Sequence, residues 1–141
     1  MQPWRKKKGL MRSTPKYSTV FDPLEREVIG DLTATVSEAL IARAQSAPKD
    51  DFAEMLGVAT GHTDAPADPR LARLLPDFER EDDEEFDGDN GLLRSLHEND
   101  IIRAKLTNLQ VVNAALGPTG GVEVTIEEAG GHQFIAALND M

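Results

Sequence analysis

A helical repeat of apolar residues is the strongest pattern along the chain, and it occurs twice. The first repeat consists of Leu24, Val28, Leu32, Val36, Ala39 and Leu40. The second repeat consists of Ile101, Ile102, Leu106, Leu109, Val112 and Leu116. A spacing of three or four residues places all members on one face of a helix. The pattern therefore predicts two long helices with their apolar faces in a core, and it predicts Leu106 and Leu109 at the centre of that core.

Capping residues indicate where these helices begin and end. Asp22 can accept a backbone N–H, Pro23 suits a first turn, and Glu25 can close a capping box, so the first helix is predicted to start here. The stretch from Ser95 to Glu98 has the same capping-box spacing. It predicts a second long helix that is separate from a short helix over residues 90–96. Gly117-Pro118 is predicted to end the second long helix.

Shorter elements are predicted in the remaining segments. A short helix over residues 51–55 is expected to face inward with Phe52, Met55 and Leu56. Asp68-Pro69 starts another, which is expected to bury Leu71, Leu74 and Leu75 before Pro76.

The two ends of the chain are predicted to hold the little β-structure present. Residues 4–8 and 11–17 flank Gly9 and predict a small hairpin. Residues 122–126 alternate like a strand, and residues 125–128 could cap a last helix. The predicted fold class is mainly α: a compact helical bundle with a long N-terminal helix, a short N-terminal β-hairpin and a short strand before the last helix. We expect one domain over residues 1–141.

Charge is distributed unevenly over a chain whose net charge is -10. Residues 1–17 hold six cations and no acid, whereas residues 77–90 hold nine acids against Arg80 alone. The acidic segment is predicted to be a loop because it repels itself. The basic arm, with Trp4 and Tyr17 among its cations, could hold nucleic acid. Since the rest of the chain would repel phosphates, the favoured interpretation is an arm near the acidic segment, and nucleic-acid binding is the alternative.

Most chemical motifs are missing. The chain has no cysteine, which excludes disulfides, thiolate nucleophiles and sulfur-ligated zinc. An EF-hand that starts at Asp83 would place Arg94 where a glutamate is needed, and one that starts at Asp87 would place Leu92 at the turn glycine. Neither a phosphate loop nor a nucleophile motif is present. We therefore expect a non-enzymatic protein without cofactor or metal. The longest apolar run has five residues, so we also expect a cytoplasmic protein that does not span a membrane.

Two sets of residues are candidates for a site. Arginines lie close to the apolar repeats and could form partly buried ion pairs that fix the helices; the candidates are Arg73, Arg94 and Arg103 with Asp68, Asp77 and Glu98. In the last predicted helix, Phe134 and Leu138 accompany Ile135. Apolar surface left uncovered there would bind a protein partner or a second copy of the chain.

The chain also resembles an actinobacterial family built on a domain of unknown function. The blocks that carry the resemblance are Trp4-Arg5, the long helix after Asp22-Pro23, residues 68–77, residues 93–96 leading to 101–104, and residues 136–140. The resemblance implies a genomic position beside the adaptor of the Clp protease, hence a link to regulated proteolysis, and some members carry a label as transcriptional regulators. It implies no catalytic residues. Family members usually continue past the Asn-Asp pair of residues 139–140, so a shortened C-terminal part is expected here. The function predicted is a non-enzymatic protein-interaction domain, with a nucleic-acid-binding regulator as the alternative.

Overall fold

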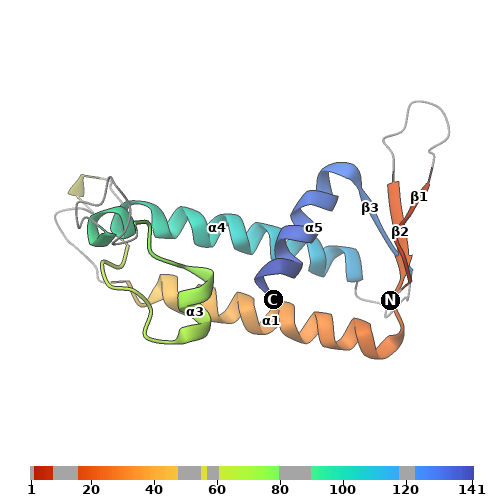
Figure 1. Cartoon of the computed structure of the whole chain (residues 1–141), viewed down its shortest axis with the longest axis horizontal. Coiled ribbons are helices and arrows are strands. Elements are labelled where there is room, and N and C mark those ends of the chain that lie inside the picture. Colours follow the sequence, from red (N-terminus) through yellow and green to blue (C-terminus); the bar gives the residue numbers. More distant parts are fainter. Residues whose placement is uncertain (1, 8–15, 48–54, 57–60, 80–89, 118–122) are drawn as a thin grey trace. The chain divides into compact units, whose positions relative to one another are not determined.

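The computed structural model describes residues 2–7, 16–47, 55–56, 61–79, 90–117 and 123–141. The chain divides into two compact units, a terminal unit of Met1–Ser37 with Lys105–Met141 and a central unit of Glu38–Ala104. The elements, labelled in Figure 1, are β1 (Arg5–Lys7), β2 (Lys16–Val20), α1 (Pro23–Gln45), α3 (Pro69–Leu74), α4 (Asn90–Leu116), β3 (Glu123–Glu127) and α5 (Glu128–Asp140). The predicted fold class is confirmed. Among the described residues, no helix combines the length and hydropathy that a membrane span requires.

The terminal unit contains an antiparallel three-stranded sheet in the order β1-β2-β3. Tyr17 lies opposite Ile126 and Thr19 opposite Val124, so these four residues share one face of the sheet. Val124 is fully buried, and α5 contacts β2 and β3 next to it (Figure 1). The strand pairing near the N-terminus and the strand before α5 are confirmed, but the second strand is Lys16–Val20 and not residues 11–17. The residues around Gly9 lie outside the described part of the chain. The three strands form the support on which α5 packs.

The start of α1 is the predicted capping box. Asp22 Oδ1 accepts hydrogen bonds from the backbone N–H of Leu24 at 2.9 Å and of Glu25 at 3.1 Å. The Asp22 N–H donates in return to Glu25 Oε2 at 3.1 Å. These contacts satisfy N–H groups that a helix start leaves without intrahelical partners.

The predicted apolar face is wrong for the first half of α1 and right for its second half. Leu24, Val28 and Leu32 are exposed, whereas Thr33 is buried. The burial of Thr33 is tolerated because its hydroxyl donates to the Ile29 carbonyl at 2.7 Å, which leaves no polar atom without a partner. Further along, Leu40 is fully buried as predicted.

A single helix, α4, replaces the two helices predicted between residues 90 and 116. Ser95 caps nothing, because its hydroxyl donates within the helix to the Leu92 carbonyl at 2.7 Å. Leu109 is fully buried, as predicted, but Leu106 is only partly buried. The helix ends where predicted, since Gly117 has a φ of 68°, and Arg26 Nη2 donates to the Gly117 carbonyl at 2.6 Å. A cation is favourable at this position because the C-terminus of a helix carries partial negative charge.

The predicted cap is right for α3 and wrong for α5. Asp68 caps α3 as predicted, accepting the Arg70 N–H at 2.8 Å. Thr125 is not a cap, because it belongs to β3, and α5 begins after Glu127 with no side-chain cap.

Two predicted segments fall mainly outside the described residues. The helix predicted over residues 51–55 does so except for Met55, which is 85% exposed and not inward-facing. Leu56, which was also expected to face inward, is exposed as well. The acidic segment 77–90 is described only at residues 77–79 and 90.

Candidate functional site

An ion pair is buried in the central unit, on one face of α4. Arg94 and Glu98 are four residues apart, so their side chains lie on the same side of the helix. Arg94 Nη1 donates to Glu98 Oε2 at 2.7 Å, and both side chains are 1% exposed. Both residues belong to the set of arginines and acids for which partly buried ion pairs were expected, without an assignment of partners.

Arg43 of α1 adds a second cation to the same carboxylate. Its Nε donates to Glu98 Oε1 at 2.7 Å and its Nη2 donates to Glu98 Oε2 at 3.3 Å. Burial of Glu98 opposes ionisation, but the hydrogen bonds and charges of Arg43 and Arg94 outweigh it, and they hold the pKa of Glu98 below 4.5. Arg43 was missing from the sequence-based candidates. Its position three residues after the buried Leu40 was the available signal.

The remaining donors of Arg94 fix the segment that follows α3. Nη1 also donates to the Leu75 carbonyl at 3.0 Å, and Nη2 donates to Asp77 Oδ1 at 3.0 Å. The guanidinium lies 5.9 Å from the centre of the Phe78 ring. The cluster of Arg43, Arg94, Glu98 and Asp77 thus finds its hydrogen-bond partners within the protein. We interpret it as a structural cluster that joins α1, α4 and the segment after α3 inside the central unit.

The other predicted ion-pair residues lie elsewhere. Asp68 caps α3 and meets Arg70, whose backbone N–H and side chain hold the pKa of Asp68 below 3.8. Arg73 is exposed on α3. Arg103 approaches Asp100 at 3.5 Å, and both side chains are largely exposed. The structure therefore brings together Asp77, Arg94 and Glu98 of the predicted set.

We searched the described part of the chain for side chains that could bind a metal ion together. No group of three or more His, Cys, Asp or Glu side chains is placed there to hold a metal ion. His62 instead interacts through Nε2 with the Arg43 carbonyl at 2.8 Å and with the Ser46 hydroxyl at 3.0 Å.

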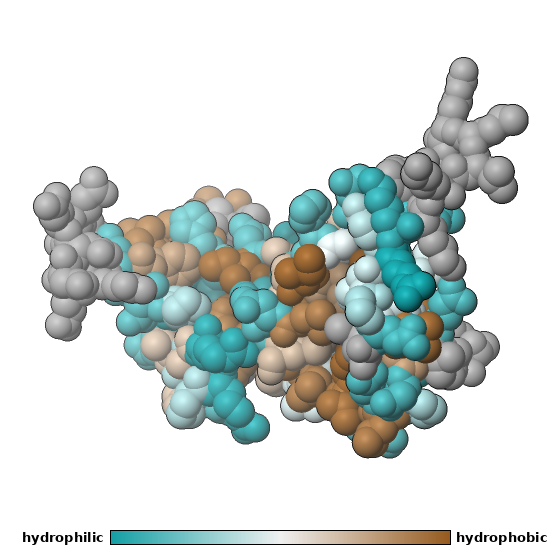
Figure 2. Space-filling view, turned by 45° about the vertical axis from the view of Figure 1, so that its right-hand side comes forward, coloured by the Kyte–Doolittle hydropathy of each residue, from teal (hydrophilic) through white to brown (hydrophobic). Residues whose placement is uncertain are grey.

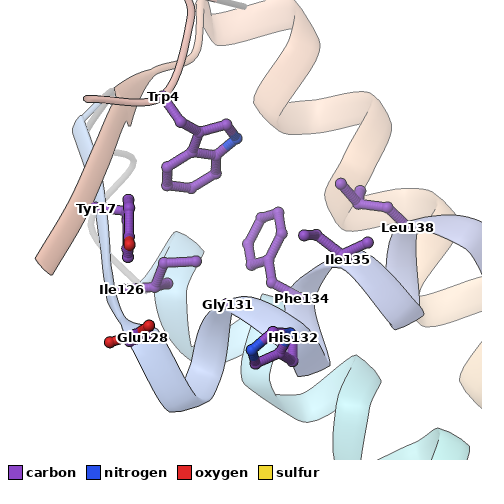
Figure 3. Close-up of a pocket in the computed structure, with 9 residues that line it drawn as sticks. All are labelled: Trp4, Tyr17, Ile126, Glu128, Gly131, His132, Phe134, Ile135 and Leu138. Atoms are coloured by element: carbon purple, nitrogen blue, oxygen red, sulfur yellow. The ribbon is translucent and has the colours of Figure 1, made fainter. Parts of the chain in front are cut away.

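A pocket of about 290 Å³ lies in the terminal unit between the sheet and α5 (Figure 3). Most of its walls are apolar, and the lining residues are Trp4, Tyr17, Ile126, Glu128, Gly131, His132, Phe134, Ile135 and Leu138. Trp4 and Phe134 point toward one another across it, with ring centres 5.4 Å apart at an angle of 77°. This edge-to-face contact joins the N-terminal strand region to α5.

Phe134 and Leu138, the two apolar candidates from the sequence, both line this pocket. Phe134 is 1% exposed and forms part of the core, and Leu138 is partly buried. Ile135, between them on α5, is 68% exposed. The exposed apolar side chain at the pocket is therefore Ile135, and Phe134 is covered.

The pocket is small and has few polar groups at its rim. Its size is at the lower limit of small-molecule sites and suits one bulky side chain. Glu128 and His132 are the charged or titratable residues of the rim, together with the Tyr17 phenol. The remaining lining residues are apolar or small, so most of the pocket wall matches an apolar group.

The comparisons with known proteins identify one family and several named relatives. The family model described as "Domain of unknown function (DUF2017)" matches residues 1–141. Proteins named "Oxidative stress regulator AosR" from Mycobacterium bovis and Mycobacterium tuberculosis are 35% identical to this chain over 139 residues. The matched region covers 92% of this chain and 63% of those relatives.

No solved structure matches the chain. The family model nevertheless covers the whole sequence, including both units and the residues of the pocket. The chain therefore belongs to the DUF2017 family.

Proposed function

We propose that this chain is a non-enzymatic regulatory protein that acts by binding another protein. The observation that carries the proposal is the apolar pocket of the terminal unit, with Ile135 exposed at its rim. A partner that covers both the exposed isoleucine and the apolar cavity buries the most apolar surface, and this burial stabilises the complex. We infer a partner that inserts one bulky apolar side chain between Trp4 and Leu138.

The name of the mycobacterial relatives supports a role in the response to oxidative stress. The 141 residues contain no cysteine, so a thiol within them cannot be the sensor. In our proposal this segment transmits the response through partner binding in the cytoplasm, and the oxidant is detected elsewhere. A link to regulated proteolysis rests on the family resemblance alone.

A nucleic-acid-binding regulator is the second candidate function. It is favoured by exposed cations on the hairpin, where Arg5 and Lys6 lie on β1 and Lys16 on β2. A two-stranded ribbon can enter the major groove of DNA. Nucleic-acid binding ranks second because Lys16 lies opposite the acidic Glu127 of β3. The net charge of -10 also repels phosphate.

Complementation in the native host tests the proposal. A strain without the gene would receive the wild type, Ile135→Glu, or the control Leu92→Glu, which changes an exposed leucine of α4 in the central unit. We expect Ile135→Glu to fold normally and to fail in survival under oxidant, whereas Leu92→Glu complements. A photo-crosslinking residue at position 135 should also capture one protein that a residue at position 92 does not. Full complementation by Ile135→Glu would contradict the proposal.

A further inference from the structure

Three apolar residues on α1 point away from the core of the terminal unit. Leu24, Val28 and Leu32 are 68%, 48% and 40% exposed, and they follow one another at intervals of one helical turn. Leu24 and the buried Thr33 are nine positions apart, so these two side chains lie on opposite sides of the helix. Hydrophobic side chains do reach the molecular surface in Figure 2. We call Leu24, Val28 and Leu32 the α1 stripe.

The α1 stripe is not flat. Leu24, Glu25, Val28 and Ile29 line a surface hollow of about 390 Å³. A single exposed leucine needs no explanation, but a row of apolar residues with a hollow marks a contact surface. The length of the row, about 12 Å along the axis, corresponds to two turns of a helix. A second helix laid along α1 would cover it.

The charge beside the α1 stripe is acidic. Glu27 and Asp31 are exposed, and they are four residues apart on one flank of the stripe. Like charges at this spacing destabilise a helix. Arg26 is the basic residue of α1 in the terminal unit, and it donates to the Gly117 carbonyl at the end of α4. A partner that brings cations to this flank would relieve the repulsion.

We propose that the α1 stripe binds an amphipathic helix of a partner protein in which lysine or arginine residues flank the apolar face. This inference rests on the proposed function, since it names the chemistry of a partner, but it uses a surface other than the pocket. An antiparallel pair of α1 helices from two copies fits poorly, because it would place Glu27 and Asp31 of both copies on the same flank. Nucleic acid and anionic lipid are repelled for the same reason.

The probe for a binding test is a synthetic amphipathic helix of about 18 residues, long enough to be helical, with leucines on one face and lysines on its flanks. Two matched peptides carry glutamates in place of the lysines, or alanines in place of the leucines. Fluorescence anisotropy with the full chain would measure affinity as salt is varied. We expect the lysine–leucine peptide to bind at least about tenfold more tightly than either matched peptide, and to weaken as salt rises.

Variants locate the site. Leu24→Ser/Val28→Ser should weaken binding of the lysine–leucine peptide at least about tenfold, with unchanged helix content, because both side chains are exposed. Glu27→Lys/Asp31→Lys should weaken it as much and remove most of the salt dependence. Leu92→Ser is the apolar control, and Glu123→Lys/Glu127→Lys on β3 is a control with the same change in net charge. Both controls should bind like the wild type.

Several outcomes would overturn the inference. One is a Leu24→Ser/Val28→Ser variant that binds the lysine–leucine peptide as tightly as the wild type. Another is a β3 charge control that loses as much affinity as Glu27→Lys/Asp31→Lys, which would show attraction to net charge only. Dimers that depend on Leu24 and Val28 in light scattering would assign the stripe to a second copy. If Ile135→Glu alone abolished peptide binding, the stripe would be excluded and the proposed function would stand. If Ile135→Glu complemented in the host while the stripe variants failed, the pocket would be excluded and the stripe would stand.

Discussion

Replacing Glu98 with glutamine should lower the free energy of unfolding by about 3–5 kcal/mol, the range for removing one partner of a buried ion pair. The substitution keeps the size and shape of the side chain and removes its charge. Arg94, which is 1% exposed, then faces a neutral amide, and so does Arg43, which is 10% exposed. The protein would retain two largely buried cations without the carboxylate that lies between them.

The magnitude follows from the contacts of the carboxylate. It accepts two hydrogen bonds at 2.7 Å, one from each arginine, and bonds of this charged kind contribute about 1.5–3 kcal/mol each. Glutamine keeps one acceptor, and its amide N–H groups would meet guanidinium N–H groups. Arg94 retains the Leu75 carbonyl and Asp77, so the loss should stay below the full sum.

Asp77 provides a matched control, because it binds the same guanidinium from a different position. Its side chain is 61% exposed, so Asp77→Asn should cost at most about 1 kcal/mol. Urea unfolding followed by far-ultraviolet circular dichroism at neutral pH would give both values. A Glu98→Gln variant within about 1 kcal/mol of the wild type, with an unchanged slope against urea, would refute the view that this cluster holds the central unit together.

Three further predictions concern stability. Because the pKa of Glu98 is held below 4.5, its carboxylate contributes fully to stability above the unfolded pKa, and this contribution is lost as the pH falls through the folded pKa. The acid-induced drop in the urea midpoint should therefore be smaller in Glu98→Gln than in the wild type. An equal drop in both proteins would contradict this. Leu109→Ala should cost about 2–5 kcal/mol, and Leu106→Ala clearly less, since only Leu109 is fully buried; equal shifts in thermal melting would argue against it. Asp22→Ala should cost about 1 kcal/mol by loss of the α1 cap, measured by urea unfolding, and an unchanged midpoint would show that the cap contributes nothing.

The starts of α1 and α3 could be predicted from sequence because a cap is local. Asp22 contacts backbone groups two and three residues ahead, and Asp68 does the same for α3. The buried face of α1 could not be predicted in this way. Apolar spacing identifies a face but does not say whether the core lies there, and in the first half of α1 the core lies on the side of Thr33. Ser95 misled for a related reason, since a serine hydroxyl can bond either at a helix start or to a carbonyl within a helix.

The sites depended on contacts that sequence spacing does not encode. Arg94 and Glu98 could be paired from their four-residue interval, but Arg43 reaches Glu98 from 55 residues away. The pocket is assembled from β2, β3 and α5 together with Trp4, which precedes β1. Phe134 and Leu138 were identified as apolar candidates because they belong to one helix. Only the packing of α5 on the sheet decides that Phe134 is covered and Ile135 is not.

The buried cluster and the exposed apolar residues differ in what their side chains do for the isolated chain. Glu98 and Arg94 find their partners inside the central unit, so changing them should alter stability first. Leu24, Val28 and Ile135 leave about half or more of their area exposed in the chain itself. That exposed apolar surface contributes, at about 25 cal/mol for each Å², only when another molecule covers it. Substitutions at these three positions should therefore change binding while the unfolding free energy stays nearly constant. That separation distinguishes a surface that serves a partner from one that is merely tolerated, because a merely tolerated apolar residue would change neither quantity.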